Sequence, residues 1–146
     1  MFIHIPLTEQ KDAWFEYMDN GYADTADAQL VYGVAGEKDP YVYCGAGEDR
    51  MFESILEQGS TQAVFFGHDH KNNFAMNYKG VQLTYSMSID YLAYIGIYKE
   101  GAQRGCTVID VKPDGSFVSK IENYYQDKYV SLYEKESVTM YDVVNG

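Results

Sequence analysis

The sequence is poor in positive charge. Only 11 of its 146 residues are Lys or Arg, against 22 Asp or Glu, and the formal net charge is −11. Nucleic acids and anionic membrane surfaces both attract basic faces, so this balance argues against both as partners. Only two residues, Arg50 and Arg104, could grip a phosphate with two parallel hydrogen bonds. Phosphate chemistry would therefore need another source of positive charge, most simply a metal ion.

Long apolar runs and cysteine pairs are also missing. The longest apolar stretch covers about residues 91–98, whereas a membrane-spanning helix needs about 18 apolar residues. The first twelve residues lack the basic and apolar regions of a signal peptide. If the chain is a piece of a longer protein, this lack does not indicate where the protein is located, and the cellular location stays unknown. Cys44 and Cys106 do not make a disulfide framework. A hydrophobic fraction of 46% with 15 tyrosines nevertheless indicates a folded core rather than a disordered chain.

Hydrophobic periodicity predicts two helices in the first half of the chain. We expect a strand over residues 1–6 and a helix over 9–19 with Thr8 as its N-cap. No sustained period runs through residues 21–47, which favours a solvated insertion or a functional loop. The period returns over 48–58, where Gly59 is a typical helix stop.

The second half of the chain is predicted to be mostly strands. We expect strands at residues 62–66 and 81–86, and in the second of these one face, with Thr84 on the other, is expected to be buried. Residues 106–111 and 117–124 are expected to form a hairpin, and short strand-like runs follow over 129–144. Helices followed by antiparallel pairs predict an α/β fold with a mixed sheet that becomes mostly antiparallel towards the C-terminus.

The three histidines are the most informative residues. His4 lies in the first predicted strand, and His68 and His70 follow the predicted strand 62–66 in the motif Gly67-His68-Asp69-His70. Residues i and i+2 of an extended segment project to one side, so His68 and His70 could face a single locus. Neutral imidazole ligates Zn, Fe and Mn. From these residues alone, a metal site and ordinary surface or core histidines remain open alternatives.

Two segments around these histidines resemble a known family. VFFGHDHKNNF (residues 64–74) resembles the last signature block of the calcineurin-like metallophosphoesterases, in the branch related to purple acid phosphatases. FIHIPL (residues 2–7) resembles the block just before it, and YKGV (78–81) and RGCTVI (104–109) also look like that branch. The resemblance covers about residues 1–122.

The resemblance implies a two-metal centre. His4 and His68 would ligate one metal and His70 the other, while Asp69 occupies a variable position of the motif. Two divalent or trivalent ions (Fe, Zn or Mn) would clamp a phosphoester, either a small molecule or a phosphoprotein, and a metal-bound hydroxide would attack it. Asn73 and Tyr85 are candidate substrate-binding residues because they lie near the motif.

The family's three earlier blocks, Asp-x-His, Gly-Asp-x-x-Asp and Gly-Asn-His-Glu/Asp, do not occur in this sequence. We therefore interpret the whole chain, residues 1–146, as a single partial domain. It would be the C-terminal half of a metallophosphoesterase-like β-sandwich flanked by helices, and residues 129–146 are a candidate C-terminal extension. The parent would be a metal-dependent phosphoesterase. This fragment alone would bind one metal ion or none and would be inactive. We can name no catalytic acid or base within it.

The interpretation as a half-domain predicts self-association, and two alternative hypotheses remain for the function of the chain. A half-domain would expose a sheet edge and the apolar side chains Phe2, Ile3, Val64 and Phe66, so the fragment is expected to form a homo-oligomer. A second hypothesis makes the chain a non-catalytic module of the same fold, with tyrosine-rich loops contacting a partner. A third makes it an unrelated β-rich domain, in which the three histidines would lie far apart.

Overall fold

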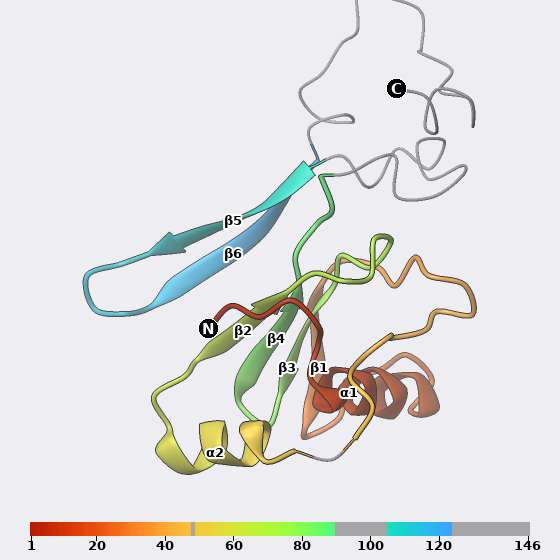
Figure 1. Ribbon diagram of the computed structural model, residues 1–146, viewed down its shortest axis with the longest axis horizontal. Coiled ribbons are helices and arrows are strands. Elements are labelled where there is room, and N and C mark those ends of the chain that lie inside the picture. The colour runs from red at the N-terminus through yellow and green to blue at the C-terminus, as the bar shows by residue number, and fades with distance from the viewer. Residues whose placement is uncertain (48, 90–104, 124–146) are drawn as a thin grey trace, which may run out of the picture. The chain divides into compact units, whose positions relative to one another are not determined.

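Four strands form a mixed sheet in the N-terminal part of the protein (Figure 1). The computed structural model describes residues 1–47, 49–89 and 105–123. The strands lie in the order β1 (Ala28–Tyr32), β3 (Ala75–Tyr78), β4 (Val81–Tyr85) and β2 (Ala63–Phe66). The β1–β3 and β3–β4 pairs are antiparallel, and β2–β4 is parallel. The sheet is therefore mostly antiparallel with one parallel edge.

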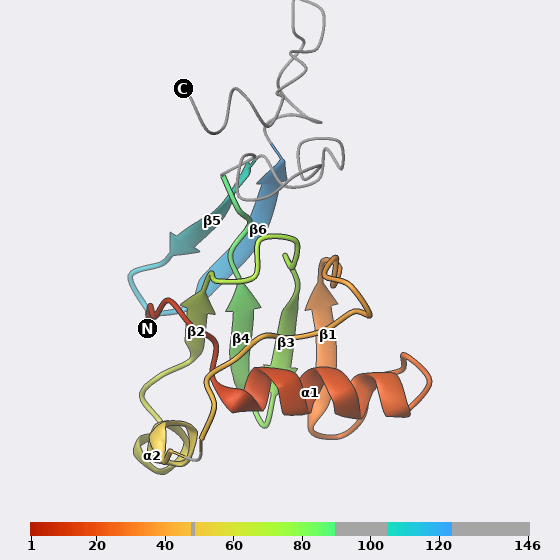
Figure 2. The same ribbon diagram turned by 45° about the vertical axis from the view of Figure 1, so that its right-hand side comes forward.

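Helix α1 (Thr8–Asp19) crosses one face of this sheet and closes the core (Figure 2). Its buried face carries Ala13 and Trp14, and the Trp14 ring lies 4.6 Å from that of Phe74 between centroids. Helix α2 (Met51–Gln58) adds Phe52 and Ile55 to the same core. Within the described residues, neither helix has the length and apolar character needed to cross a membrane.

The start of the chain runs alongside β2. The amide of Phe65 donates to the carbonyl of Met1, and the amide of Ile3 donates to the carbonyl of Phe65, both at 3.0 Å. Phe2 and Phe65 form a parallel bridge, and their rings stack at 5.5 Å. Residues 1–4 therefore lie along the outer edge of β2, where Phe2 forms a single β-bridge rather than part of a strand.

A separate hairpin follows the sheet in sequence. The chain divides into two compact units, Met1–Ser86 and Met87–Gly146. In the second unit, β5 (Gly105–Val111) pairs in antiparallel register with β6 (Phe117–Asn123). A turn closed by hydrogen bonds between Lys112 and both Gly115 and Ser116 joins the two strands.

The sequence located most of these elements. The predicted helices 9–19 and 48–58 are α1 and α2, and Gly59 ends α2 with a φ of 64°. The predicted strands 62–66 and 81–86 are β2 and β4, and the predicted hairpin is β5 and β6. The α/β prediction with a mostly antiparallel sheet and helices is confirmed.

Several details were wrong. Leu7, not Thr8, is the N-cap of α1. Thr8 is already the first helical residue, and its hydroxyl donates to the Glu9 carboxylate rather than accepting from a helix amide. The predicted strand 1–6 contributes only the Phe2 bridge. Residues 21–47 contain β1, and β3 was not predicted. Thr84, expected on a polar face, is fully buried.

Val64 and Phe66 were predicted to be exposed, but both are buried, because β4 pairs along their strand and their side chains belong to the hydrophobic core. The predicted apolar stretch 91–98, the tail 129–146 and Arg104 lie outside the described residues.

Candidate functional site

A tight turn follows β2 and carries the first histidine of the motif. The amide of Asp69 donates to the carbonyl of Gly67 at 2.9 Å, and His68 between them has a φ of 74°. A hydrogen bond from residue i+2 to residue i with a positive φ at the centre defines the rarer, strained form of γ-turn. The segment is therefore not extended at His68, contrary to the geometry assumed from the sequence.

His4 and His68 come together beside this turn. The amide of Gly67 donates to the carbonyl of His4 at 3.1 Å, which fixes the two backbones side by side. The two imidazole centroids lie 5.5 Å apart with the rings edge to face. A Cβ on Gly67 would lie 3.9 Å from Nδ1 of His4, so glycine leaves the space beside that ring open. Both side chains are exposed.

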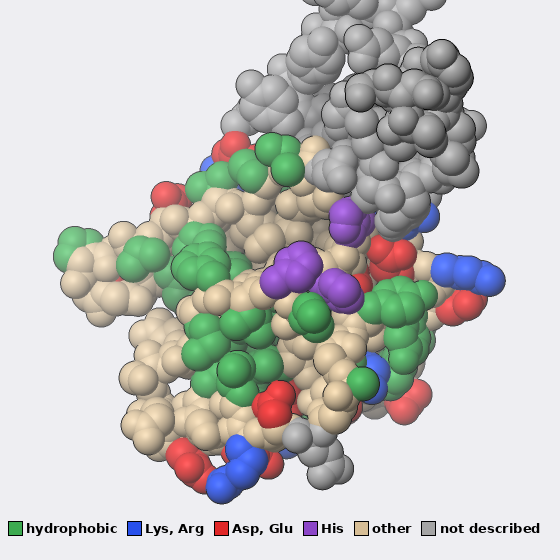
Figure 3. Space-filling view, in the orientation of Figure 1, with side chains coloured by type: hydrophobic (Ala, Val, Ile, Leu, Met, Phe, Trp, Pro, Cys, Tyr) green, Lys and Arg blue, Asp and Glu red, His purple; other side chains and the backbone are tan. Residues whose placement is uncertain are grey.

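All three histidines show on one face of the molecule (Figure 3). His70 is half-buried. The closeness of His4 and His68 disfavours the unrelated β-rich domain, in which the histidines would lie far apart. The assignment of all three as metal ligands stays a prediction.

Asp69 points the other way, into the protein. It is 4% exposed, and its Oδ2 accepts hydrogen bonds from the Tyr43 amide at 3.0 Å, the Asn72 side chain at 2.8 Å and the Tyr85 hydroxyl at 2.5 Å. Burial raises the pKa of the Asp69 carboxyl, and the three donors oppose that rise. Burial, then the hydrogen bond to Asp69, raise the pKa of Tyr85, which keeps its hydroxyl neutral and donating.

Residues 33–43 are fastened to the motif by side chain to backbone hydrogen bonds. Asn72, fully buried, accepts from the Glu37 amide at 3.2 Å and donates to the Tyr41 carbonyl at 2.9 Å. Asn73 accepts from the Val34 amide at 2.9 Å. This stretch, which we call the 33–43 segment, therefore depends on residues more than thirty positions away for its conformation.

The two candidate substrate-binding residues are both internal. Tyr85 is fully buried, with its hydroxyl on Asp69, and Asn73 is 5% exposed, with its carboxamide oxygen on Val34. Their contact with substrate stays a prediction. The sequence analysis did not predict that Asp69 and Asn72 would organise buried hydrogen bonds. The pattern that could have indicated it is the run of polar residues at 68–73, directly after the most buried strand.

A cation suits the chemistry of the exposed His4 and His68 pair. Within residues 1–47, 49–89 and 105–123, however, no three His, Cys, Asp or Glu side chains group in a way that could hold a metal ion. The nearest carboxylate in sequence, Asp69, is turned inward and already accepts three hydrogen bonds. The described residues therefore fit a partial ligand set.

Comparison with known proteins points to one group of relatives. Over 93 residues, 64% of this chain, the sequence is 29% identical to "Probable inactive purple acid phosphatase 28" of Arabidopsis thaliana, covering 19% of that protein. Over 61 residues, 42% of this chain, it is 37% identical to "Probable inactive purple acid phosphatase 29" of the same plant, covering 15% of it.

No protein-family model matches the chain, and no solved structure does. The chain spans less than a fifth of the length of both relatives. The partial similarity is consistent with the metallophosphoesterase resemblance of residues 2–7 and 64–74, and both relatives carry names that mark them as inactive.

Proposed function

We propose that this chain carries the histidine part of a dinuclear phosphoesterase centre, within the C-terminal half of a metallophosphoesterase-like β-sandwich. His4 and His68 would hold one metal ion, and His70 would contribute to the second. The observation that carries the proposal is the His4–His68 pair, 5.5 Å apart and exposed beside the glycine that follows β2. Ligands at strand ends next to a glycine are typical of sites in α/β sheets.

The metal ions would supply the positive charge and the activated water that phosphoester hydrolysis needs. The chain's own contribution is to orient imidazole nitrogens on a rigid turn and to keep its carboxylates away from a phosphate. Asp69, next to two histidines, is buried rather than presented to solvent. An acidic protein of net charge −11 could then still bind an anionic substrate, because the cations reverse the local field.

The chain by itself should hydrolyse phosphoesters poorly or not at all. Imidazoles without a bridging carboxylate neither neutralise nor space two cations, so we expect one partly occupied ion completed by water or foreign ligands. The word "inactive" in both relatives' names supports a low activity. Robust metal-dependent hydrolysis of an aryl phosphate by the purified chain would contradict this part of the proposal.

A Zn²⁺ titration followed by imidazole NMR and calorimetry tests the metal assignment. We expect His4→Ala and His68→Ala each to weaken Zn²⁺ binding by at least about tenfold, because each removes a ligand. Asp12→Asn, an exposed substitution that removes one negative charge, is the control for non-specific binding to an acidic surface. His70→Ala shows whether the third histidine serves the same ion. Unchanged affinity in His4→Ala and His68→Ala would overturn the proposal.

We further propose that the chain self-associates through its first residues. Phe2 is 75% exposed, and in the described part of the chain no strand pairs with the outer side of residues 1–4. Light scattering at micromolar concentration should show a dimer or larger species that Phe2→Ser shifts towards monomer. Leu56→Ser, on the exposed face of α2, should leave the mass unchanged. A monomeric wild-type chain would refute this.

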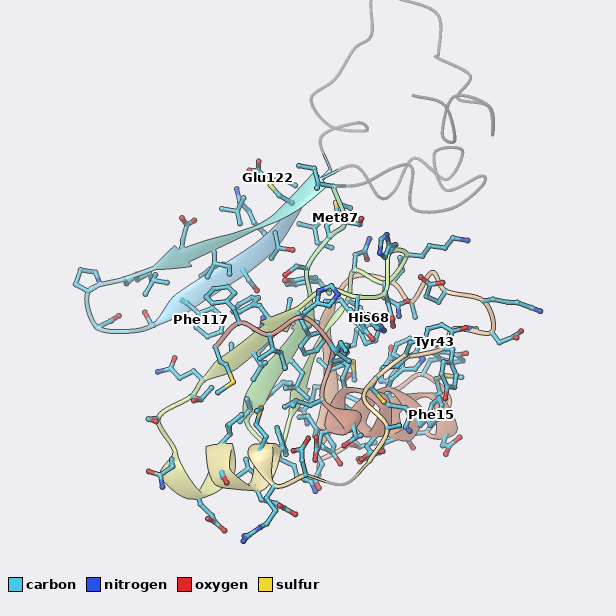
Figure 4. All side chains as sticks on the ribbon, in the orientation of Figure 1. Phe15, Tyr43, His68, Met87, Phe117 and Glu122 are labelled. Carbon is cyan, nitrogen blue, oxygen red and sulfur yellow. The ribbon has the colours of Figure 1, made fainter. Side chains whose placement is uncertain are left out.

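A binding module is the second candidate function. Phe15, Tyr41 and Tyr43 are all exposed by more than a third. The Tyr41 ring contacts the Phe15 ring at 6.1 Å and the Tyr43 ring at 4.9 Å between centroids, edge to face in both cases, and Figure 4 labels Phe15 and Tyr43. Such an exposed aromatic cluster favours a protein contact. The Zn²⁺ titration separates the two functions, because a chain that binds no metal but keeps its fold would favour the module.

A further inference from the structure

We propose that Asp69 is a positioning residue that holds the His68 turn in its strained form and so keeps His68 facing His4. The inference rests on the proposed function only in assigning a metal to that histidine pair. The geometry itself is independent of any metal.

The turn at His68 needs an external restraint. A positive φ of 74° at a side-chain-bearing residue is sparsely populated, and such residues persist only where the surrounding structure over-determines them. On the N-terminal side, the hydrogen bond from the Gly67 amide to the His4 carbonyl supplies one restraint. On the C-terminal side, the restraint must come through Asp69.

Asp69 supplies it from three directions. Its single oxygen Oδ2 accepts from Tyr43 in the 33–43 segment, from Tyr85 at the end of β4, and from Asn72 three residues further along its own loop. Three donors on separate pieces of backbone fix the position of one carboxylate. With Asp69 held inward, the neighbouring His68 (labelled in Figure 4) is exposed, and its ring lies 5.5 Å from that of His4 between centroids.

The same contacts exclude Asp69 as a metal ligand in this arrangement. The carboxylate is 4% exposed and directed into the protein, whereas both His4 and His68 are exposed. Its role is therefore to act through His68. The ring of Tyr85, which packs 4.9 Å from Phe66 and 5.2 Å from Phe74, anchors the hydroxyl donor in the core.

Three variants of the full chain separate positioning from other roles. Asp69→Ala removes all three hydrogen bonds, and Tyr85→Phe removes one donor while keeping the ring. Asp69→Asn keeps an acceptor oxygen but loses the charge. Asp12→Asn and Tyr22→Phe are matched controls, because both side chains are exposed and neither contacts the motif.

The first measurement needs no metal: the nuclear Overhauser effect between the ring protons of His4 and His68. We expect it to be strong in the wild type and both controls, reduced in Tyr85→Phe, and lost in Asp69→Ala. Asp69→Asn should lie near the wild type, because hydrogen-bond acceptance rather than charge does the positioning. Amide spectra establish that each variant is folded, and Tyr85→Phe decides if Asp69→Ala does not fold.

The second measurement is Zn²⁺ affinity. Residues that orient a ligand typically contribute about 10–100-fold to metal binding, so we expect a loss of about tenfold or more in Asp69→Ala and a smaller loss in Tyr85→Phe. If folded Tyr85→Phe and Asp69→Ala keep both the ring contact and the affinity, the inference is overturned. If the wild type binds no Zn²⁺ but the ring contact still depends on Asp69, the metal proposal fails and the positioning role stands.

Discussion

The 33–43 segment and the β5–β6 hairpin differ in how they are held. The hairpin follows a regular antiparallel register from Gly105↔Asn123 to Val111↔Phe117, yet none of the side chains of residues 106–122 is buried. The 33–43 segment has almost no regular structure, yet side chains of Asn72, Asn73 and Asp69 bond its backbone. Regular backbone pairing and integration into the core are therefore separate properties.

The difference also explains where the candidate site lies. A hairpin with no buried side chain over residues 106–122 can bend with little consequence for a core, because its pairing is local. The 33–43 segment is fixed by contacts that cross 26 to 39 residues of sequence and end at Asp69, Asn72 and Asn73, in and just after the histidine motif. Rigid support of that kind is what a ligand-positioning loop requires.

The largest effect is expected at Gly33. Its φ is 91°, and a Cβ there would lie 2.3 Å from the carbonyl oxygen of Asn73. Gly115 in the hairpin turn has a similar φ of 84° with nothing within 4 Å of its Cβ position. Gly33→Ala should therefore destabilise the protein by on the order of 4 kcal/mol or prevent folding. Gly115→Ala should cost only about 1–2 kcal/mol, the penalty of the left-handed backbone.

Urea denaturation measures the stability of both glycine variants. Trp14 fluorescence follows unfolding of the first unit in Gly33→Ala, and amide NMR follows unfolding of the hairpin in Gly115→Ala. Equal losses in the two variants would mean that the close approach between Gly33 and Asn73 carries no energetic weight.

The next largest effect is expected at Asn72. Truncation in Asn72→Ala leaves the Glu37 amide and the Tyr41 carbonyl without their partner and removes one of the donors to Asp69. We expect a loss of about 3 kcal/mol in the free energy of unfolding, because unsatisfied buried polar groups are costly. In the hairpin, Lys120→Ala breaks an exposed ion pair to Glu122 at 3.2 Å and should change stability by less than about 1 kcal/mol. A small loss in Asn72→Ala would mean that the 33–43 segment is not held by these bonds.

The same contrast explains what the sequence could predict. Local signals located α1, α2, β2, β4 and the hairpin, because apolar period, Gly59 and the turn at residues 112–115 are encoded within a few residues of each element. β1 was missed because its partner β3 lies more than forty residues further along the chain. β3 was missed because its four residues, AMNY, do not alternate between apolar and polar side chains. For the site, the sequence blocks at residues 2–7 and 64–74 predicted His4, His68 and His70 as metal ligands, and that assignment stays a prediction. The inward direction of Asp69 depends on Tyr43 and Tyr85, which no local pattern links to it.

Gln10 provides the converse of Asn72. Its side chain is fully buried in α1, and neither its amide nitrogen nor its oxygen has a hydrogen-bond partner in the described part of the chain. Gln10→Met keeps the length of the side chain and removes the unsatisfied polar atoms, so it should raise the free energy of unfolding by about 1 kcal/mol. Urea denaturation measures the gain. A loss of stability would show that the carboxamide is satisfied in solution.

The smallest effect concerns the two thiols, one in each unit. Cys44 is half-buried beside the Asp69 and Tyr85 network, and burial raises the pKa of its thiol; Cys106 on β5 is exposed. A raised pKa lowers the thiolate fraction at any given pH, and the thiolate is the form that reacts. The rate of alkylation of Cys44 by iodoacetamide, measured in Cys106→Ser, should therefore rise at a higher pH than the rate of a small free thiol such as N-acetylcysteine. Cys44→Ser, which keeps the exposed Cys106, is the control for reagent access. Slower reaction at every pH with no shift of the midpoint would indicate restricted access alone. A midpoint for Cys44 below that of the free thiol would contradict the expectation and would mean that Lys11, the neighbouring charge that lowers its pKa, outweighs burial.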